Sequence, residues 1–131
     1  MRIIDLITKD RILLSASAAD KQDAIEKMVE LQAKSGNLSD KEVYKQAILA
    51  REAMSSTAIE AGIAVPHAKS ETVTAPSLCA MTLKEGVDYG AMDGQPSDLF
   101  FMIAAPLNGD LHLALLDILL LMPLFRYMPS Y

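Results

Sequence analysis

REAMSSTAIEAGIAVPHAK, residues 51–69, contains a cation, a row of hydroxyl residues and one of the 2 histidines of the chain. An apolar run at residues 63–65 leads to Pro66, and His67 follows at once. Because proline fixes φ and lacks a backbone N–H, this order of residues predicts that the imidazole of His67 is held at a rigid strand end. The alternative interpretation is an ordinary turn histidine without a chemical role.

Other residues of this segment fit a site for an anion. Arg51 can hold a negative charge, although a basic residue in the last turn of a helix also suits the negative end of the helix dipole. The hydroxyl residues 55–57 can donate to an anion or simply close the helix. Three small residues leave little side-chain bulk around His67, so another macromolecule can approach the ring closely. These residues are Gly62, Ala64 and Ala68.

The second histidine follows the most apolar part of the chain. LFFMIAAP, residues 99–106, has the length and composition of a central strand buried on both faces. Asp110 then predicts an N-cap, and His112 lies in the first turn of a helix expected over residues 111–124. If this strand runs beside and parallel to the strand that ends at Pro66, both imidazoles reach one rim of the sheet, where open α/β sheets bind ligands.

Two earlier segments have helical periodicity. Residues 18–35 place apolar residues at helical spacing and end at Gly36. Ser39 and Glu42 form the capping-box pattern before a second helix that reaches about Met54. Its predicted buried face consists of Val43, Ala47, Ile48 and Leu49.

Two further strands complete the expected fold. Residues 12–14 predict a short strand after an initial turn or short helix, and residues 77–83 alternate as a half-buried strand. Strands mixed with helices around a central buried strand predict one α/β (α+β) domain over residues 1–131. We expect a mixed β-sheet sandwiched by helices.

The composition argues against several classes of function. A net charge of −5 without a stripe of Lys and Arg argues against nucleic-acid binding. The single cysteine, Cys79, predicts a buried thiol, no disulfide framework and a reducing, cytoplasmic location. Acidic residues interrupt the apolar N-terminus, so no signal peptide is expected. The apolar segment 111–124 is too short and too interrupted to span a bilayer.

The segment 51–69 resembles the active-site segment of the fructose/mannitol-type enzyme IIA domains (PTS EIIA type 2) of the bacterial phosphoenolpyruvate-dependent sugar phosphotransferase system. In that family an RE pair precedes a threonine, a glycine-containing turn and a sequence close to AIPHGK. The stretch GAMDGQPSDLFFMIAAPLNGDLHLALL, residues 90–116, is similar to the second signature of the family. The likeness extends from about Ile4 to Leu116 and is greatest with the fructose branch.

The resemblance implies a role for each of four residues. His67 is the phosphorylated residue and takes the phosphoryl group on Nε2, while His112 hydrogen-bonds that group or the first imidazole. Arg51 helps to hold the charge, and Thr57 lines the pocket. A neutral imidazole is a suitable nucleophile, and phosphoryl transfer mainly needs positioning and charge compensation. Neither a cofactor nor a metal is implied.

The partners implied by the resemblance are those of a phosphocarrier. Phospho-HPr, the histidine-containing carrier protein, donates the phosphoryl group, and a cysteine of an enzyme IIB domain accepts it. The group then reaches fructose or a related sugar entering through a IIC channel, so contact with the membrane is only indirect. Cys79 is not that acceptor, because it belongs to a strand of the IIA unit.

The chain departs from the family pattern in two places. Ala61 and Ala68 stand where glycines are common, which we expect to alter little. The larger departure is DILLLMPLFRYMPSY, residues 117–131, which lacks the amphipathic pattern of the family's C-terminal helices. We therefore expect the domain to lack the usual C-terminal helix, with an altered or truncated terminus.

Three alternatives to the sugar phosphocarrier stay open. A nitrogen-type regulatory enzyme IIA is phosphorylated in a similar way but controls other proteins. A non-catalytic metal- or ligand-binding module would use both histidines, although two histidines without a nearby carboxylate or thiolate make a poor zinc site. In a structural interaction domain, His67 and His112 would be turn and cap residues.

Overall fold

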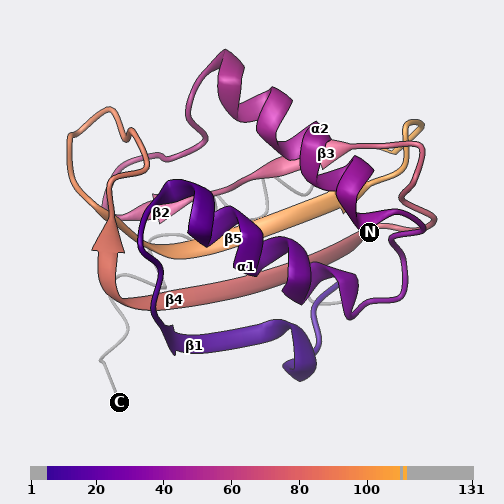
Figure 1. Cartoon of the computed structure of the whole chain (residues 1–131), viewed down its shortest axis with the longest axis horizontal. Helices are drawn as coiled ribbons and strands as arrows, with labels where there is room; N and C mark the ends of the chain where they lie inside the picture. Colours follow the sequence, from indigo (N-terminus) through magenta and orange to yellow (C-terminus); the bar gives the residue numbers. More distant parts are fainter. Residues whose placement is uncertain (1–5, 110, 112–131) are drawn as a thin grey trace.

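The computed structural model describes residues 6–109 and 111 (Figure 1). Its elements are, in chain order, η2 (Lys9–Arg11), β1 (Ile12–Ala16), α1 (Lys21–Ala33), α2 (Lys41–Met54), β2 (Ile63–Ala64), β3 (His67–Lys69), β4 (Ser77–Val87) and β5 (Ser97–Ala105). The strands form a 5-stranded sheet in the order β1-β4-β5-β2, and β3 also pairs with β5. The predicted α/β domain with a mixed sheet is confirmed.

Strand β5 is the centre of the sheet, as its apolar sequence predicts. It pairs antiparallel with β4 and parallel with both β2 and β3. The residues from Phe100 to Ala105 are buried. The strands on either side of Pro66, β2 and β3, therefore both run parallel to β5. This is the arrangement that the sequence-based hypothesis requires of the apolar strand and the strand that ends at Pro66.

Strand β4 is longer and more buried than its alternation indicates. It continues to Val87, and its residues from Ser77 to Met81 are all buried, so the prediction of a half-buried strand over residues 77–83 is wrong. The reason is that Cys79 and Leu78 belong to separate apolar clusters on opposite faces of the sheet. The predicted burial of the Cys79 thiol is confirmed, and this burial raises its pKa.

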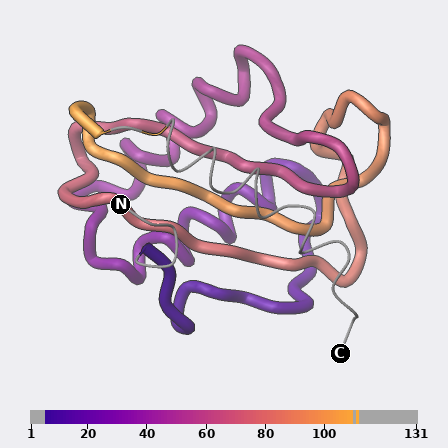
Figure 2. The backbone as a smooth tube through the Cα atoms, turned by 180° about the vertical axis from the view of Figure 1, so that it is seen from behind, coloured from indigo at the N-terminus to yellow at the C-terminus, as the bar shows by residue number. Residues whose placement is uncertain are grey.

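Both described α-helices lie on one face of the sheet, in front of the strands in Figure 1. Tyr44 and Ile48 of α2 share one core cluster with Phe100 and Met102 of β5. The opposite face carries a second cluster that includes Val65, Leu78, Phe101 and Ile103. Figure 2 shows this second face from behind, with both described α-helices on the far side.

Helix α1 is capped at its N-terminus by its own acidic residues. Asp20 accepts the backbone N–H of Asp23 at 2.8 Å, and Asp23 in return accepts the N–H of Ala19 at 2.8 Å. Hydrogen bonds from the side chain of Lys27 and from Ala19 lower the pKa of Asp23. This reciprocal cap fixes the start of the helix at Lys21, inside the predicted range 18–35.

Helix α2 is confirmed, but two details of its prediction are wrong. Asp40, not Ser39, is the N-cap and accepts the N–H groups of Glu42 and Val43. The hydroxyl of Ser39 donates instead to the carbonyl of Thr72 at 2.9 Å, which ties two loops together. The buried residues of the helix are Tyr44, Ile48 and Glu52, whereas Val43 is 42% exposed. Ile48 is buried as predicted, and Ala47 and Leu49 are partly buried against the core, so Val43 is the one residue of the predicted face that is wrong.

Strand β1 is the exposed edge of the sheet. It contains the predicted residues 12–14 and pairs in parallel with β4, with an irregular register between Leu13 and Ala16. Ser15 has a φ of 56° at this irregularity. The helix expected after Asp110, apart from Leu111, and the atypical segment 117–131 lie outside the described residues. Within the described part of the chain, no helix has the length and apolar character needed to cross a membrane.

Candidate functional site

His67 is the first residue of β3 and is half-buried. Its Nδ1 lies 2.8 Å from the carbonyl oxygen of Val65. A carbonyl oxygen only accepts hydrogen bonds, so Nδ1 must carry the proton and donate it. In the neutral imidazole, the lone pair is then on Nε2. The ring therefore has one defined nucleophilic nitrogen.

Pro66 separates β2 from β3 and thereby sets the position of the imidazole. Both short strands pair with β5, and the carbonyl of Pro66 accepts the N–H of Ile103 at 3.0 Å. The sequence places His67 after a strand end, whereas the structure places it at the start of a second short strand. Its backbone is paired with Ile103, so the ring is carried by the sheet.

The small residues next to His67 have a different role from the expected one. Ala64 and Ala68 belong to the core cluster on the helix side of the sheet, where they are 0% and 7% exposed. Successive residues of a strand point to opposite faces, so the side chain of Ala68 lies on the face opposite to that of His67. These alanines leave room for the packing of the helices and do not form an open rim around the imidazole.

Arg51 occupies the last turn of α2 and is half-buried. Its Nη1 donates to the carbonyl of Ser55 at 2.9 Å and lies 3.5 Å from the hydroxyl of that residue. The described hydrogen bonds of Arg51 thus cap the C-terminal end of its own helix. A guanidinium has five N–H donors, so further donors are available for an anion.

Thr57 is buried, with 7% exposure, and is held by Glu52. The backbone N–H of Thr57 donates to Oε1 of Glu52 at 3.1 Å, and its hydroxyl donates to Oε2. A threonine hydroxyl has a single proton, which here is committed to the carboxylate. The hydroxyl can therefore donate to a phosphoryl group only if this hydrogen bond breaks.

Sequence reasoning missed the buried cluster around Glu52. Lys21 forms an ion pair with Glu52 at 3.0 Å, and its Nζ lies 4.4 Å from the centroid of the Tyr89 ring. Burial and the nearby charge of Glu52 raise the pKa of Tyr89. The signal that could have revealed Glu52 is its spacing, four residues after Ile48 and eight after Tyr44, on the buried face of α2.

A loop of the second signature supports the turn before His67. The carboxylate of Asp93 accepts the N–H of Ala61 at 3.1 Å. Ala61 and Gly62 have φ values of 61° and 78°, which favour glycine. The expectation that alanine at position 61 alters little is thus qualified, because its Cβ is strained in this conformation.

The remaining site prediction and the metal alternative depend in part on His112, which lies outside the described residues. In residues 6–109 and 111, no three His, Cys, Asp or Glu side chains are grouped as metal ligands would be. The structure therefore describes three of the predicted site residues: Arg51, Thr57 and His67.

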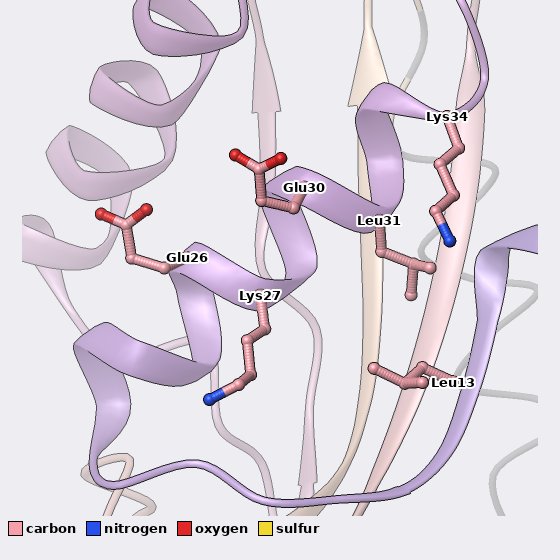
Figure 3. A pocket seen from close by; sticks show the side chains of 6 residues that line it. All are labelled: Leu13, Glu26, Lys27, Glu30, Leu31 and Lys34. Atoms are coloured by element: carbon pink, nitrogen blue, oxygen red, sulfur yellow. The ribbon is translucent and has the colours of Figure 1, made fainter.

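An apolar groove lies between β1 and α1 (Figure 3). Its volume is ≈ 380 Å³, and Leu31 of α1 points toward Leu13 of β1. The other lining residues are charged: Glu26, Lys27, Glu30 and Lys34. The groove lies at the β1 edge of the sheet, whereas His67 lies at the opposite edge. We do not assign the candidate site to this groove, since it holds neither a histidine nor a hydroxyl residue.

Comparisons with known proteins point to one family. The family model described as phosphoenolpyruvate-dependent sugar phosphotransferase system, EIIA 2, matches residues 5–123. The fructose-specific EIIABC component of Bacillus subtilis (strain 168) is 48% identical over 105 residues, which are 80% of this chain and 16% of that protein. The chain thus spans only a small part of that relative. The fructose-specific EIIA component of Haloferax volcanii is 37% identical over 109 residues, 82% of this chain and 71% of that protein.

Other matches extend the comparison to regulators and to solved structures. The nitrogen regulatory protein of Pseudomonas aeruginosa is 30% identical over 106 residues, 81% of this chain and 69% of that protein. The crystal structure of IIA mannitol from Escherichia coli has a TM-score of 0.72 at 30% identity, and covers 86% of this chain and 79% of its own. The complex of enzyme IIA mannitol with phosphorylated enzyme IIB mannitol, also from Escherichia coli, has a TM-score of 0.73 at 28% identity, with coverages of 87% and 78%.

Proposed function

The chain belongs to the EIIA 2 family of the phosphoenolpyruvate-dependent sugar phosphotransferase system, and we propose that it is a phosphocarrier whose phosphoryl group is carried by His67. The observation that carries this proposal is the 2.8 Å hydrogen bond between Nδ1 of His67 and the carbonyl of Val65. It leaves the lone pair of the ring on Nε2, the nitrogen that accepts the phosphoryl group in our proposal.

The transfer needs few other groups. Phosphoryl transfer passes through a loose, in-line transition state, which is stabilised mainly by positioning and by compensation of charge. Arg51 and His112 are our candidates for holding the charge of the phosphoryl group. Thr57 contributes through its position next to the strand that leads to His67. No metal and no cofactor are part of the proposal.

We assign phospho-HPr as the donor and an enzyme IIB domain as the acceptor. The mannitol complex with phosphorylated IIB supports an acceptor of this kind, because its IIA chain has the same fold. The two fructose-specific relatives support fructose or a related sugar as the final acceptor. These partners place the chain in the cytoplasm, with the membrane reached only through a IIC component.

The test of phosphorylation is the intact mass of the protein after incubation with phosphoenolpyruvate, enzyme I and HPr. Wild type should gain one acid-labile phosphoryl group, and His67→Ala should gain none while keeping its circular dichroism spectrum. His112→Ala should be phosphorylated or dephosphorylated more slowly. A folded wild-type protein that gains no phosphoryl group contradicts the proposal.

A nitrogen-type regulatory function is the second candidate, because the nitrogen regulatory protein of Pseudomonas aeruginosa also matches the chain. Both functions require phosphorylation of His67, so they differ in the next step. Transfer from the phosphorylated chain to a cysteine of a fructose-type IIB domain supports the sugar phosphocarrier. Retention of the phosphoryl group in the presence of that domain favours the regulator.

A further inference from the structure

Glu52 is a carboxylate buried inside the protein, with a side chain that is 4% exposed. Buried carboxylates are stable only with good partners. Lys21 supplies a positive charge at 3.0 Å, and Thr57 supplies its backbone N–H and its hydroxyl. Both oxygens of the carboxylate are used, one for each donor of Thr57. Glu52 therefore fixes both the backbone and the side chain of that residue.

Thr57 begins a short hairpin formed by residues 57–65. Its carbonyl accepts the N–H of Val65 at 3.1 Å, and Ala58 and Ala64 form an antiparallel bridge next to this bond. The far arm of the hairpin includes β2, which pairs with β5 of the sheet. The position of Thr57 thus determines how the backbone of Val65 is oriented.

Val65 connects the hairpin to the imidazole. Its N–H is bound by Thr57, and its carbonyl accepts the Nδ1 proton of His67. One peptide segment therefore joins the residue held by Glu52 to the nitrogen that defines the tautomer. Each step of this connection is a described hydrogen bond, and together the steps run from the buried carboxylate to the ring.

We propose that Glu52 is a positioning residue for phosphoryl transfer, because it fixes Thr57 and, through the hairpin, the Val65 carbonyl that keeps the proton of His67 on Nδ1. This inference rests on the proposed phosphorylation of His67. The described ion pair and hydrogen bonds of Glu52 are with Lys21 and Thr57, and its charge also acts on Tyr89, so it acts on the imidazole only through other residues.

In the transfer step, the lone pair of Nε2 forms the new N–P bond while the P–N bond to the donor's phosphohistidine breaks. The electron pair of the broken bond stays on the donor imidazole, and the Nδ1 proton of His67 stays in place. With the proton on Nε2 instead, the lone pair of the ring is on Nδ1, and Nε2 cannot form the new bond. If the Val65 carbonyl is displaced, a smaller fraction of the protein molecules has the lone pair on Nε2. The rate of transfer at saturating donor falls in proportion.

The first test compares Glu52→Gln with Glu42→Gln, a matched control on the same helix whose side chain is 64% exposed. Glutamine has one carbonyl oxygen, so only one of the two donors of Thr57 keeps an acceptor. With HPr, enzyme I and phosphoenolpyruvate, we expect Glu52→Gln to lower kcat by about tenfold without changing KM for phospho-HPr. Glu42→Gln should stay within about twofold of wild type. A wild-type kcat, or a change confined to KM, overturns the positioning role.

The second test reads the tautomer of His67 directly in the unphosphorylated protein, by ¹⁵N nuclear magnetic resonance of the imidazole. Wild type should carry the proton on Nδ1, and Glu52→Gln should shift the population toward the Nε2–H form. A merely structural loss would lower the free energy of unfolding and leave the tautomer unchanged, which overturns the inference. This measurement needs no phosphoryl donor, so it tests the role of Glu52 even if the wild type is never phosphorylated. Failure of the wild type to be phosphorylated would overturn only the proposed function.

If Glu52→Gln does not fold, variants of Thr57 test the same connection. Thr57→Val removes the hydroxyl but keeps the branched shape and the backbone N–H, and we expect about a threefold fall in kcat with a shifted tautomer. Thr57→Ser keeps the hydroxyl, so its kcat should fall less than that of Thr57→Val. Equal losses in both variants, or an unchanged tautomer in Thr57→Val, overturn the proposal.

Discussion

The two edges of the sheet are held in different ways. At one edge, β1 has 5 residues, but Ile12, Leu13 and Leu14 are 39%, 40% and 68% exposed. At the other edge, β2 and β3 have only 2 and 3 residues, yet all but Lys69 are buried or half-buried. Strand length therefore does not determine how firmly an edge is fixed. The shorter strands are held by their pairing with β5 and by backbone hydrogen bonds of the hairpin, such as the N–H of Ile59 that donates to the carbonyl of Ile63 at 2.8 Å.

The ion pairs differ in the same way. Lys41 at the start of α2 pairs with Glu30 of α1, which also lines the groove at the β1 edge, and the two side chains are 52% and 61% exposed. In the pair behind the hairpin, Lys21 is 31% exposed and Glu52 is 4% exposed. Exposed pairs contribute little to stability, whereas removal of one buried partner leaves polar groups without a partner. The candidate site thus lies on the edge where single substitutions should cost most.

The largest difference is expected between Glu52→Ala and Glu30→Ala. Loss of Glu52 leaves the buried N–H and hydroxyl of Thr57 without an acceptor, which should lower the free energy of unfolding by about 2–3 kcal/mol. Loss of the exposed Glu30 should cost less than about 0.5 kcal/mol. Urea titration followed by circular dichroism measures both values. Equal values would remove the energetic contrast between the two edges.

A smaller difference is expected between the loss of a hydroxyl that binds the central strand β5 and the loss of one at the β1 edge. The hydroxyl of Tyr44 donates to the buried carbonyl of Ile103 at 3.1 Å, so Tyr44→Phe should cost about 1 kcal/mol. At the β1 edge, the exposed N–H of Ser15 donates to the hydroxyl of Thr82 at 2.8 Å, and Thr82→Val removes this acceptor. Water can replace that acceptor, so the cost should stay below about 0.5 kcal/mol. Thermal unfolding of the two variants compares them, and a reversed order would be evidence against the contrast.

Each edge also contains one residue other than glycine with positive φ. Ala61 has a φ of 61° and Ser15 a φ of 56°. Because a Cβ is unfavourable in this region, Ala61→Gly and Ser15→Gly should each raise the free energy of unfolding by about 0.5–1 kcal/mol. Chemical denaturation measures the gain. Here the edges should behave alike, because the strain is local; a loss of stability in either variant would show that the side chain contributes more than the strain costs.

The smallest effect is expected for Leu14→Thr on the β1 edge. The side chain of Leu14 is 68% exposed, and exposed substitutions away from special features usually change stability by less than about 0.5 kcal/mol. Threonine is also a good strand residue, so the backbone should be unaffected. A loss of more than about 1 kcal/mol in differential scanning calorimetry would mean that this edge is covered in solution.

The sequence predicts the centre of this fold better than its edges. The run at residues 99–106 is apolar throughout, and a run of this length is typical of a strand buried on both faces. Strand β4 continues past Leu83, although the next two residues are charged, because Val87 pairs with Ser97 of β5. Such pairing depends on the partner strand, so the local alternation at residues 77–83 cannot show it. Propensity and pattern describe one segment at a time.

The candidate site was predictable in part. His67 was identified from its neighbours in the chain, and its parallel neighbour β5 from the apolar run. Glu52 was not, because an acidic residue near a helix end normally faces water. Its charged partner Lys21 comes from another helix, and its contact with Thr57 forms only when the chain turns back after α2. The orientation of the imidazole depends on the carbonyl of Val65, which no side-chain pattern reports.

Around Pro66, which separates β2 from β3, the number of residues matters as much as their types. Val65 and His67 are separated by one residue, so their side chains share a face of the sheet, and Ala68 points to the face covered by the helices. Deletion of Pro66 would place the imidazole on the face covered by α2 and expose an alanine in its place. Point substitutions cannot produce this inversion. Along this short stretch, whether the number of residues is odd or even decides which face of the sheet carries the imidazole.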